Sequence, residues 1–208
     1  MVKAPALSDP TRLRFSPVAI VLHWTIAALM LTNIVLAWRF NGLKAGLRWY
    51  ELIQLHKSIG ITVLLLTVLR LLWRLVHPPP AYPPEMKRWE KAAASAVHWG
   101  FYGLMVGLPI TGWLMVSASP KNLPTLLYKK VPWPHIGAIH HLPIEQRQHL
   151  TDLFSGAHEA LTYVAYVLIV LHVGAALRHQ FFTRDRVLWR MLPIPALRPR
   201  DVRPQEVR

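Results

Sequence analysis

Histidine is the residue type whose number and placement in this chain point most directly to chemistry. The chain of 208 residues contains 11 histidines, and several of them lie inside long apolar stretches. Those in or next to apolar stretches are His23, His56, His98, His158 and His172. An ionisable side chain in apolar surroundings is costly, so it is kept where it pairs with or binds something. The absence of cysteine excludes disulfide scaffolds, Cys-ligated zinc, iron–sulfur clusters and haem attached through thiols.

His158 and His172 carry the most information because they fall in one apolar stretch. Their spacing is close to four turns of an α-helix, so both side chains point in the same direction, about 21 Å apart along the axis. Ala165, a small residue, lies midway on that face. One helix therefore presents two imidazoles, one toward each of its ends.

The elements that position these histidines are predicted to be four membrane-spanning helices. Residues 18–38, 92–120 and 160–177 contain no charged side chain, and residues 52–76 are charged only near their ends. A helix needs about 20 mostly apolar residues to cross a bilayer, whereas a helix of a soluble bundle would show a polar face. We expect spans at about 17–39, 52–76, 92–117 and 157–180. Bulky residues follow the first span, so it is not a cleaved signal peptide.

The distribution of Lys and Arg predicts the orientation. Most of these cations lie before the first span, between the second and third, and after the fourth, so we expect both termini in the cytoplasm. The expected fold is an all-α, integral membrane four-helix bundle, with one domain over residues 1–193. An Arg- and Pro-rich cytoplasmic tail, expected to be mobile, follows over 194–208. The formal net charge of +14 is better explained by anionic lipid than by nucleic acid, because the basic residues border the spans.

This topology places the histidines in pairs at matching depths. His23 and His172 are expected near the cytoplasmic surface, and His56 and His158 near the outer one. Two imidazoles facing each other in an apolar bundle are what a b-type haem requires as axial ligands. When both axial positions are filled, the chemistry is single-electron transfer. A histidine-lined metal transporter is the main alternative, although its metal would be expected to use carboxylates, which the spans almost lack.

Three further residues are candidates for the carboxylates of the inner haem: His98, Arg70 and Arg74. A structural histidine at a helix end and plain interfacial anchoring by the two arginines are equally good explanations.

The connection between the third and fourth spans, over about residues 117–156, contains a group of histidines and a group of cations. The histidines are His135, His140, His141 and His149, and the cations are Lys121, Lys129, Lys130 and Arg147. Cations at a mouth raise the arrival rate of small anions, although an ordinary lipid-facing basic loop would look the same. The histidine group is alternatively a zinc or copper site.

Several short segments together resemble the bacterial cytochrome b561 family over about residues 12–193. They are residues 16–24 (SPVAIVLHW), 56–60 (HKSIG), 68–75 (VLRLLWRL), 108–112 (LPITG), the histidines at 158, 172 and 179, and residues 188–193 (LWRMLP). The resemblance maps the family's four haem ligands onto His23, His56, His158 and His172. It implies a membrane protein of the bacterial inner membrane that binds two haem b groups.

The best-described activity in this family is that of a superoxide oxidase, which takes electrons from superoxide outside the cell membrane and passes them to ubiquinone. The resemblance therefore implies an oxidoreductase whose partners are membrane lipid, a quinone and superoxide. The alternative is a cytochrome b subunit that carries electrons between a redox protein partner and the quinone pool. The connection between the third and fourth spans is longer and richer in histidine here than in the compact members of the family.

Overall fold

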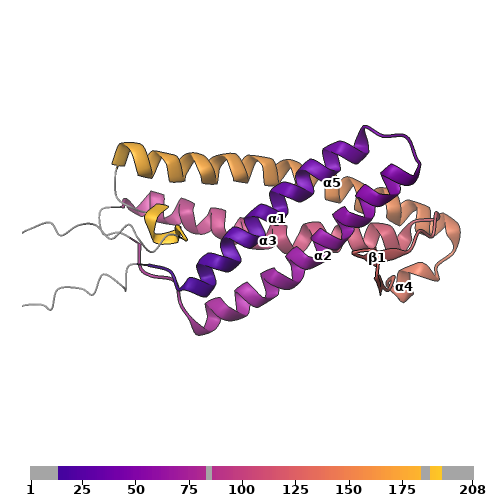
Figure 1. Cartoon of the computed structure of the whole chain (residues 1–208), viewed down its shortest axis with the longest axis horizontal. Helices are drawn as coiled ribbons and strands as arrows, with labels where there is room; N and C mark the ends of the chain where they lie inside the picture. Colours follow the sequence, from indigo (N-terminus) through magenta and orange to yellow (C-terminus); the bar gives the residue numbers. More distant parts are fainter. Residues whose placement is uncertain (1–13, 83–85, 184–187, 194–208) are drawn as a thin grey trace, which may run out of the picture.

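The computed structural model describes residues 14–82, 86–183 and 188–193, and its main elements are four long helices (Figure 1). These are α1 (Pro17–Asn41), α2 (Leu47–Val76), α3 (Arg88–Ala118) and α5 (Ile144–Arg178). A π-helical turn (His179–Thr183) continues α5, and a short 3₁₀ helix spans Leu188–Met191. Each long helix is long and apolar enough to cross a membrane. The prediction of an all-α chain with four apolar helices is therefore confirmed, while the side on which the termini lie stays a prediction.

The helix ends follow from local sequence. Ser16 caps α1, its Oγ accepting a hydrogen bond from Ala19 N at 3.3 Å, with Pro17 in the first helical position. Helix α2 ends at Val76, directly before His77 and three prolines that cannot continue it. The expected tail over 194–208, and the mobility predicted for it, lie outside the described residues.

Helix α5 begins at Ile144, well before residue 157, where the fourth span was expected to start. Its first turns are polar, which is why they do not look like a membrane span, but they contain good helix formers and no proline after Pro143. The non-helical connection is correspondingly shorter than the sequence indicated. His158 consequently lies well inside α5 rather than at its mouth.

The four helices pack as two close pairs, α1 with α2 and α3 with α5, joined mainly through contacts between α2 and α3. The buried core consists of Ile26, Leu36, Ile59, Val63, Tyr102 and Met105. A Cβ added at Gly100 would lie 2.9 Å from Leu168 Cδ1, and one at Gly107 would lie 3.3 Å from Leu161 Cδ1. Close approach of α3 to α5 therefore depends on Gly100 and Gly107, whereas Gly103 faces open space.

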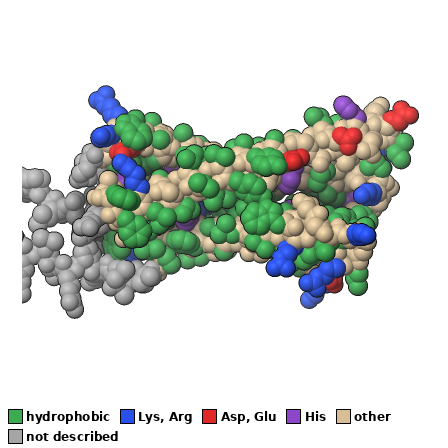
Figure 2. Space-filling view, turned by 90° about the horizontal axis from the view of Figure 1, so that it is seen from above, with side chains coloured by type: hydrophobic (Ala, Val, Ile, Leu, Met, Phe, Trp, Pro, Cys, Tyr) green, Lys and Arg blue, Asp and Glu red, His purple; other side chains and the backbone are tan. Residues whose placement is uncertain are grey.

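The sides of the bundle are apolar and its ends carry the charges. Figure 2 shows hydrophobic side chains along the length of one face, with most Lys and Arg near the two ends. Large apolar side chains are exposed along the helices, among them Leu75 at 78% and Val170 at 70%. Such a surface would be unfavourable in water and is favourable against lipid chains.

The connection between α3 and α5 contains a small hairpin that the sequence did not reveal. Strands β1 (Thr125–Leu127) and β2 (Val131–Trp133) pair antiparallel, and the short helix α4 (Gly137–His140) follows. The turn has positive φ at Tyr128 (50°) and Lys129 (63°), which residues other than glycine rarely adopt. The turn signals are weak and the strands are short, which explains why the hairpin was not predicted.

Hydrogen bonds to α2 hold the hairpin in place. The side-chain amide of Gln54 donates to Pro124 O at 2.7 Å, and its carbonyl accepts from Leu126 N at 3.2 Å. The buried hydroxyl of Ser58 accepts from Tyr128 N at 2.9 Å. We call this end of the bundle the connection end, and the opposite end, where α1 begins and α5 finishes, the termini end (Figure 1).

Candidate functional site

Two pairs of histidines face each other, one near each end of the bundle. The ring centroids of His56 (α2) and His158 (α5) are 6.4 Å apart at the connection end. Those of His23 (α1) and His172 (α5) are 6.1 Å apart at the termini end. The structure thus brings together the same residues that the depth argument paired. Both pairs bridge the interval between the α1–α2 pair of helices and α5.

The spacing within each pair suits one metal ion between two imidazoles. Two metal–nitrogen bonds of about 2.0 Å and two ring radii of about 1.2 Å would place the centroids about 6.4 Å apart. Interplanar angles of 69° and 65° exclude parallel stacking of the rings in either pair. By contrast, His135 and His140 in the connection touch directly, with Nδ1 atoms 3.1 Å apart and centroids at 4.6 Å.

Hydrogen bonds orient both rings at the connection end. His56 Nδ1 lies 3.1 Å from the backbone oxygen of Asn33, which can only accept, so this nitrogen carries the proton. His158 Nδ1 lies 3.1 Å from Thr111 Oγ1. The Thr111 hydroxyl has its own acceptors in Gly107 O at 2.8 Å and Leu108 O at 3.0 Å, so it accepts from His158.

In both rings this leaves Nε2 without a proton and able to bind a metal. A second-shell bond from the other ring nitrogen is the usual arrangement of histidines that ligate metals. The residues at this end therefore fit a haem, which His56 and His158 would hold. Thr111 was not recognised from the sequence, although it lies in the LPITG segment that contributed to the family resemblance.

The pair at the termini end is surrounded by aromatic and cationic side chains. The ring of Trp24 lies 5.4 Å from that of His23, and Phe101 lies 5.3 Å from His172. His98, for which no partner at its own depth was expected, has its ring centroid 5.8 Å from that of His172. His98 is thus a neighbour of this pair rather than an isolated residue at a helix end.

The two arginines predicted near the inner site both lie at the termini end. The charge of Arg70 acts on His23 and on His172, and its Nε donates to the Tyr102 hydroxyl at 3.4 Å. Arg74 lies over the rings of Trp99 and Tyr102, at 5.8 and 5.7 Å. Arg70 is the better placed of the two to meet a carboxylate beside the histidines.

The histidines of the connection do not form a metal site among the described residues, where no group of three or more suitable ligands was found. His140 Nδ1 also lies 3.3 Å from Ser117 O, so His140 donates and His135 Nδ1 accepts. Burial, and secondarily the nearby charge of His140, lower the pKa of His135 below 6.5. His149 stands apart on α5, in a shallow depression with Glu145, Gln146 and Leu150.

The cations predicted to attract an anion differ in what they contact. Lys129 Nζ forms an ion pair with Glu51 at 2.8 Å. Arg147 is 8% exposed, and its guanidinium donates to the backbone oxygens of Ala118 and Ser119 and to the side-chain oxygen of Asn122. The expectation that Arg147 adds to an exposed cationic face is therefore wrong, because this residue fastens the connection to the first turn of α5.

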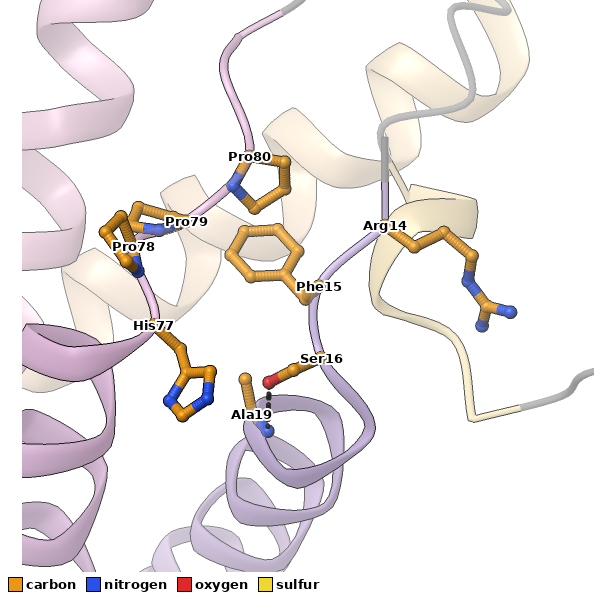
Figure 3. A pocket seen from close by; sticks show the side chains of 8 residues that line it. All are labelled: Arg14, Phe15, Ser16, Ala19, His77, Pro78, Pro79 and Pro80. Atoms are coloured by element: carbon orange, nitrogen blue, oxygen red, sulfur yellow. Dashed lines mark hydrogen bonds between the residues drawn. The ribbon is translucent and has the colours of Figure 1, made fainter. Parts of the chain in front are cut away.

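A small hollow lies at the termini end, between the start of α1 and the prolines after α2 (Figure 3). Phe15 and His77 face it, whereas the Arg14 side chain extends away toward the C-terminal segment (Figure 3). Its volume of about 180 Å³ is below the range of about 300–1,000 Å³ typical of ligand pockets. We assign it no ligand.

Four apolar helices with a facing histidine pair near each end are the arrangement expected of a membrane cytochrome b. The model of the prokaryotic cytochrome b561 family matches residues 14–193, and the chain belongs to this family. The resemblance noted in the sequence is thereby confirmed. Membership implies haem b and makes the chain a multi-pass membrane protein.

Three curated relatives match nearly the whole domain. Cytochrome b561 homolog 2 of Escherichia coli K12 is 29% identical over 180 residues, covering 86% of this chain and 91% of the relative. Cytochrome b561 homolog 1 of the same strain is 28% identical over 181 residues, covering 86% and 97%. The probable superoxide oxidase CybB of Yersinia pestis is 29% identical over 183 residues, covering 86% and 96%.

Proposed function

We propose that this protein binds two haem b groups in the bacterial inner membrane, oxidises superoxide at the connection end and reduces ubiquinone. The observation that supports it best is the presence of two imidazole pairs, at metal-bridging distances, near opposite ends of one bundle. His23 and His172 would hold one haem, and His56 and His158 the other. A haem held by two imidazoles would supply single-electron transfer.

The chain's own residues orient and shield these sites. Asn33 O and Thr111 Oγ1 fix the rings of His56 and His158 and keep Nε2 free of protons. Arg70 and His98 are proposed to meet the haem carboxylates at the termini end, with Arg74 behind them against Trp99 and Tyr102. The apolar helices would keep bulk water away from a haem bound at these sites.

Superoxide is proposed as the electron donor for two reasons. A relative of similar length carries the name probable superoxide oxidase, and lysines lie at the connection end, where an anion would arrive. The balanced reaction takes two superoxide anions, one ubiquinone and two protons to two dioxygen molecules and one ubiquinol. Each superoxide gives up one electron, and the quinone accepts two.

Haem binding can be tested on the purified protein with a reduced-minus-oxidised spectrum. We expect b-type bands from two haems. His158→Ala should remove the haem at the connection end and His23→Ala the one at the termini end, each variant keeping about half of the haem. Loss of both haems, or of neither, from either variant would contradict the pairing.

The activity can be tested by supplying a superoxide source and a soluble ubiquinone to the same protein. We expect quinol to appear faster than in the absence of the protein, and the acceleration to disappear on addition of superoxide dismutase. An unchanged rate would reject the superoxide oxidase function and favour a cytochrome b subunit that receives electrons from a protein partner.

A further inference from the structure

At the connection end, only some of the cations are available to meet an anion. Lys129 is neutralised by Glu51 at 2.8 Å. Arg147 is buried and uses its guanidinium to hold backbone oxygens of the connection. These two residues cannot act as an anion-binding site without breaking contacts that organise the connection.

Lys57 differs from both because its ammonium group has no counter-ion among the residues that the structure describes. It directly follows His56 in α2 and is only partly exposed. Its charge acts on His56 in its own helix and on His135 of the connection. Within the part of the chain that the structure describes, no carboxylate or other acceptor pairs with it. A partly buried cation without a partner has lost hydration that nothing in the protein offsets.

Lys57 lies in α2 next to His56 and next to the residue that holds the hairpin. Successive residues of an α-helix are turned by about 100°. Lys57 is therefore turned by about 100° from His56 and by about 100° from Ser58. The hairpin covers the face that carries Ser58, because Tyr128 N donates to Ser58 Oγ at 2.9 Å. Lys57 is thus one residue away from the proposed haem ligand His56 and one residue away from the serine that anchors the hairpin.

We propose that Lys57 binds the superoxide anion beside the His56/His158 pair, an inference that rests on the function proposed above. The ammonium group of Lys57 provides a partner for the single negative charge of superoxide. After giving up one electron to the protein, superoxide leaves as neutral dioxygen. Lys57 therefore attracts the substrate and does not retain the product. A haem carboxylate is also an oxygen anion and is the other candidate partner for this cation. The experiment below distinguishes superoxide from the haem carboxylate.

The test compares Lys57→Gln and Lys57→Arg with the wild-type protein and with Lys130→Gln. Lys130 is an exposed lysine of the hairpin turn, so its loss removes the same charge from the same end. At low ionic strength, Lys57→Gln should lower the second-order rate constant for superoxide about five-fold, and Lys57→Arg should restore most of it. The wild-type rate should fall as salt is added, and the Lys57→Gln rate should fall less. Lys130→Gln should lower the rate much less than Lys57→Gln does.

Haem content and the midpoint potentials of both haems are measured on the same samples. We expect them to be unchanged in Lys57→Gln. A loss of haem or a shifted potential, with an unchanged superoxide rate per haem, would assign Lys57 to a haem carboxylate and overturn the proposal. If the wild-type protein is active and Lys57→Gln reacts with superoxide at the same rate, the proposal is also overturned. An inactive wild type would instead reject the superoxide function, and the role of Lys57 with it.

Discussion

At the scale of single residues, the residue type and its depth in the membrane identify the proposed haem ligands. They do not identify the residues that hold these ligands by hydrogen bonds. The positions of His23, His56, His158 and His172 along apolar stretches are enough to pair them, because depth follows directly from the count of residues along a helix. The role of Thr111 depends on how α3 crosses α5, which no single-helix argument contains. The same limit applies to Arg147, a basic residue whose burial follows from the fold of the connection.

The hydrogen bond from His158 Nδ1 to Thr111 Oγ1 leads to a first prediction. Thr111→Val should keep the fold and weaken haem binding at the connection end by about 10–100-fold, the usual effect of losing a second-shell partner. Titration of the haem-free protein with haem measures this affinity. Thr162→Val is the matched control, because Thr162 Oγ1 donates to the backbone oxygen of His158 at 2.8 Å and does not touch its ring. Equal losses in the two variants would contradict the role of Thr111.

At the scale of elements, hydropathy locates the apolar helices and does not locate the polar segments. The apolar parts of α1, α2 and α3 are visible in the sequence, since lack of charge is all that a lipid environment demands. The first turns of α5 and the hairpin are not, because the former are polar and the latter is held by side chains of α2 such as Gln54 and Ser58. A tertiary contact thus decides the structure of the connection.

The close contact of α3 with α5 leads to a second prediction. Gly100→Leu should lower the free energy of unfolding by about 1–3 kcal/mol, because the new side chain must displace Leu168, only 2.9 Å from a Cβ at position 100. Gly103→Leu adds the same side chain to the same helix where no atom lies within 4 Å of the Cβ, and should have little effect. Thermal unfolding in detergent measures both. A larger loss in Gly103→Leu would disprove this view of the interface.

The connection should loosen in acid, a third prediction that follows from the lowered pKa of His135. Its ordinary pKa is 6.5, and burial lowers it in the folded connection. His135 therefore binds a proton more readily when the connection is detached from the bundle. Packing of the connection against the bundle is fully stable above about pH 6.5 and is weakened as the pH falls below that value. The positive charges of His140, Lys57 and Arg147 act in the same direction.

Hydrogen exchange of residues 119–143, corrected for its intrinsic pH dependence, measures this loosening. Protection should fall between pH 7 and pH 5 in the wild type and vary much less in His135→Gln. Protection that is constant over this range in the wild type would refute the prediction.

At the scale of the whole molecule, the even number of long helices places the start of α1 and the finish of α5 at one end (Figure 1). The excess of Lys and Arg at that end predicts that it faces the cytoplasm. A green fluorescent protein fused after Arg208 should therefore fluoresce, and alkaline phosphatase fused there should be inactive. The same enzyme inserted after Lys130, in the exposed hairpin turn, should be active. The reverse pattern would place superoxide chemistry on the wrong side of the membrane for an external donor.

Helix α5 supplies one histidine to each pair, and this has a consequence for the order of biosynthesis. It is the last of the four long helices to be synthesised. When α1 and α2 have already entered the membrane, His23 and His56 still lack the imidazoles that face them. Neither pair is complete until α5 has been inserted beside α3. We therefore expect the two proposed haems to be acquired by a bundle that is already in the membrane.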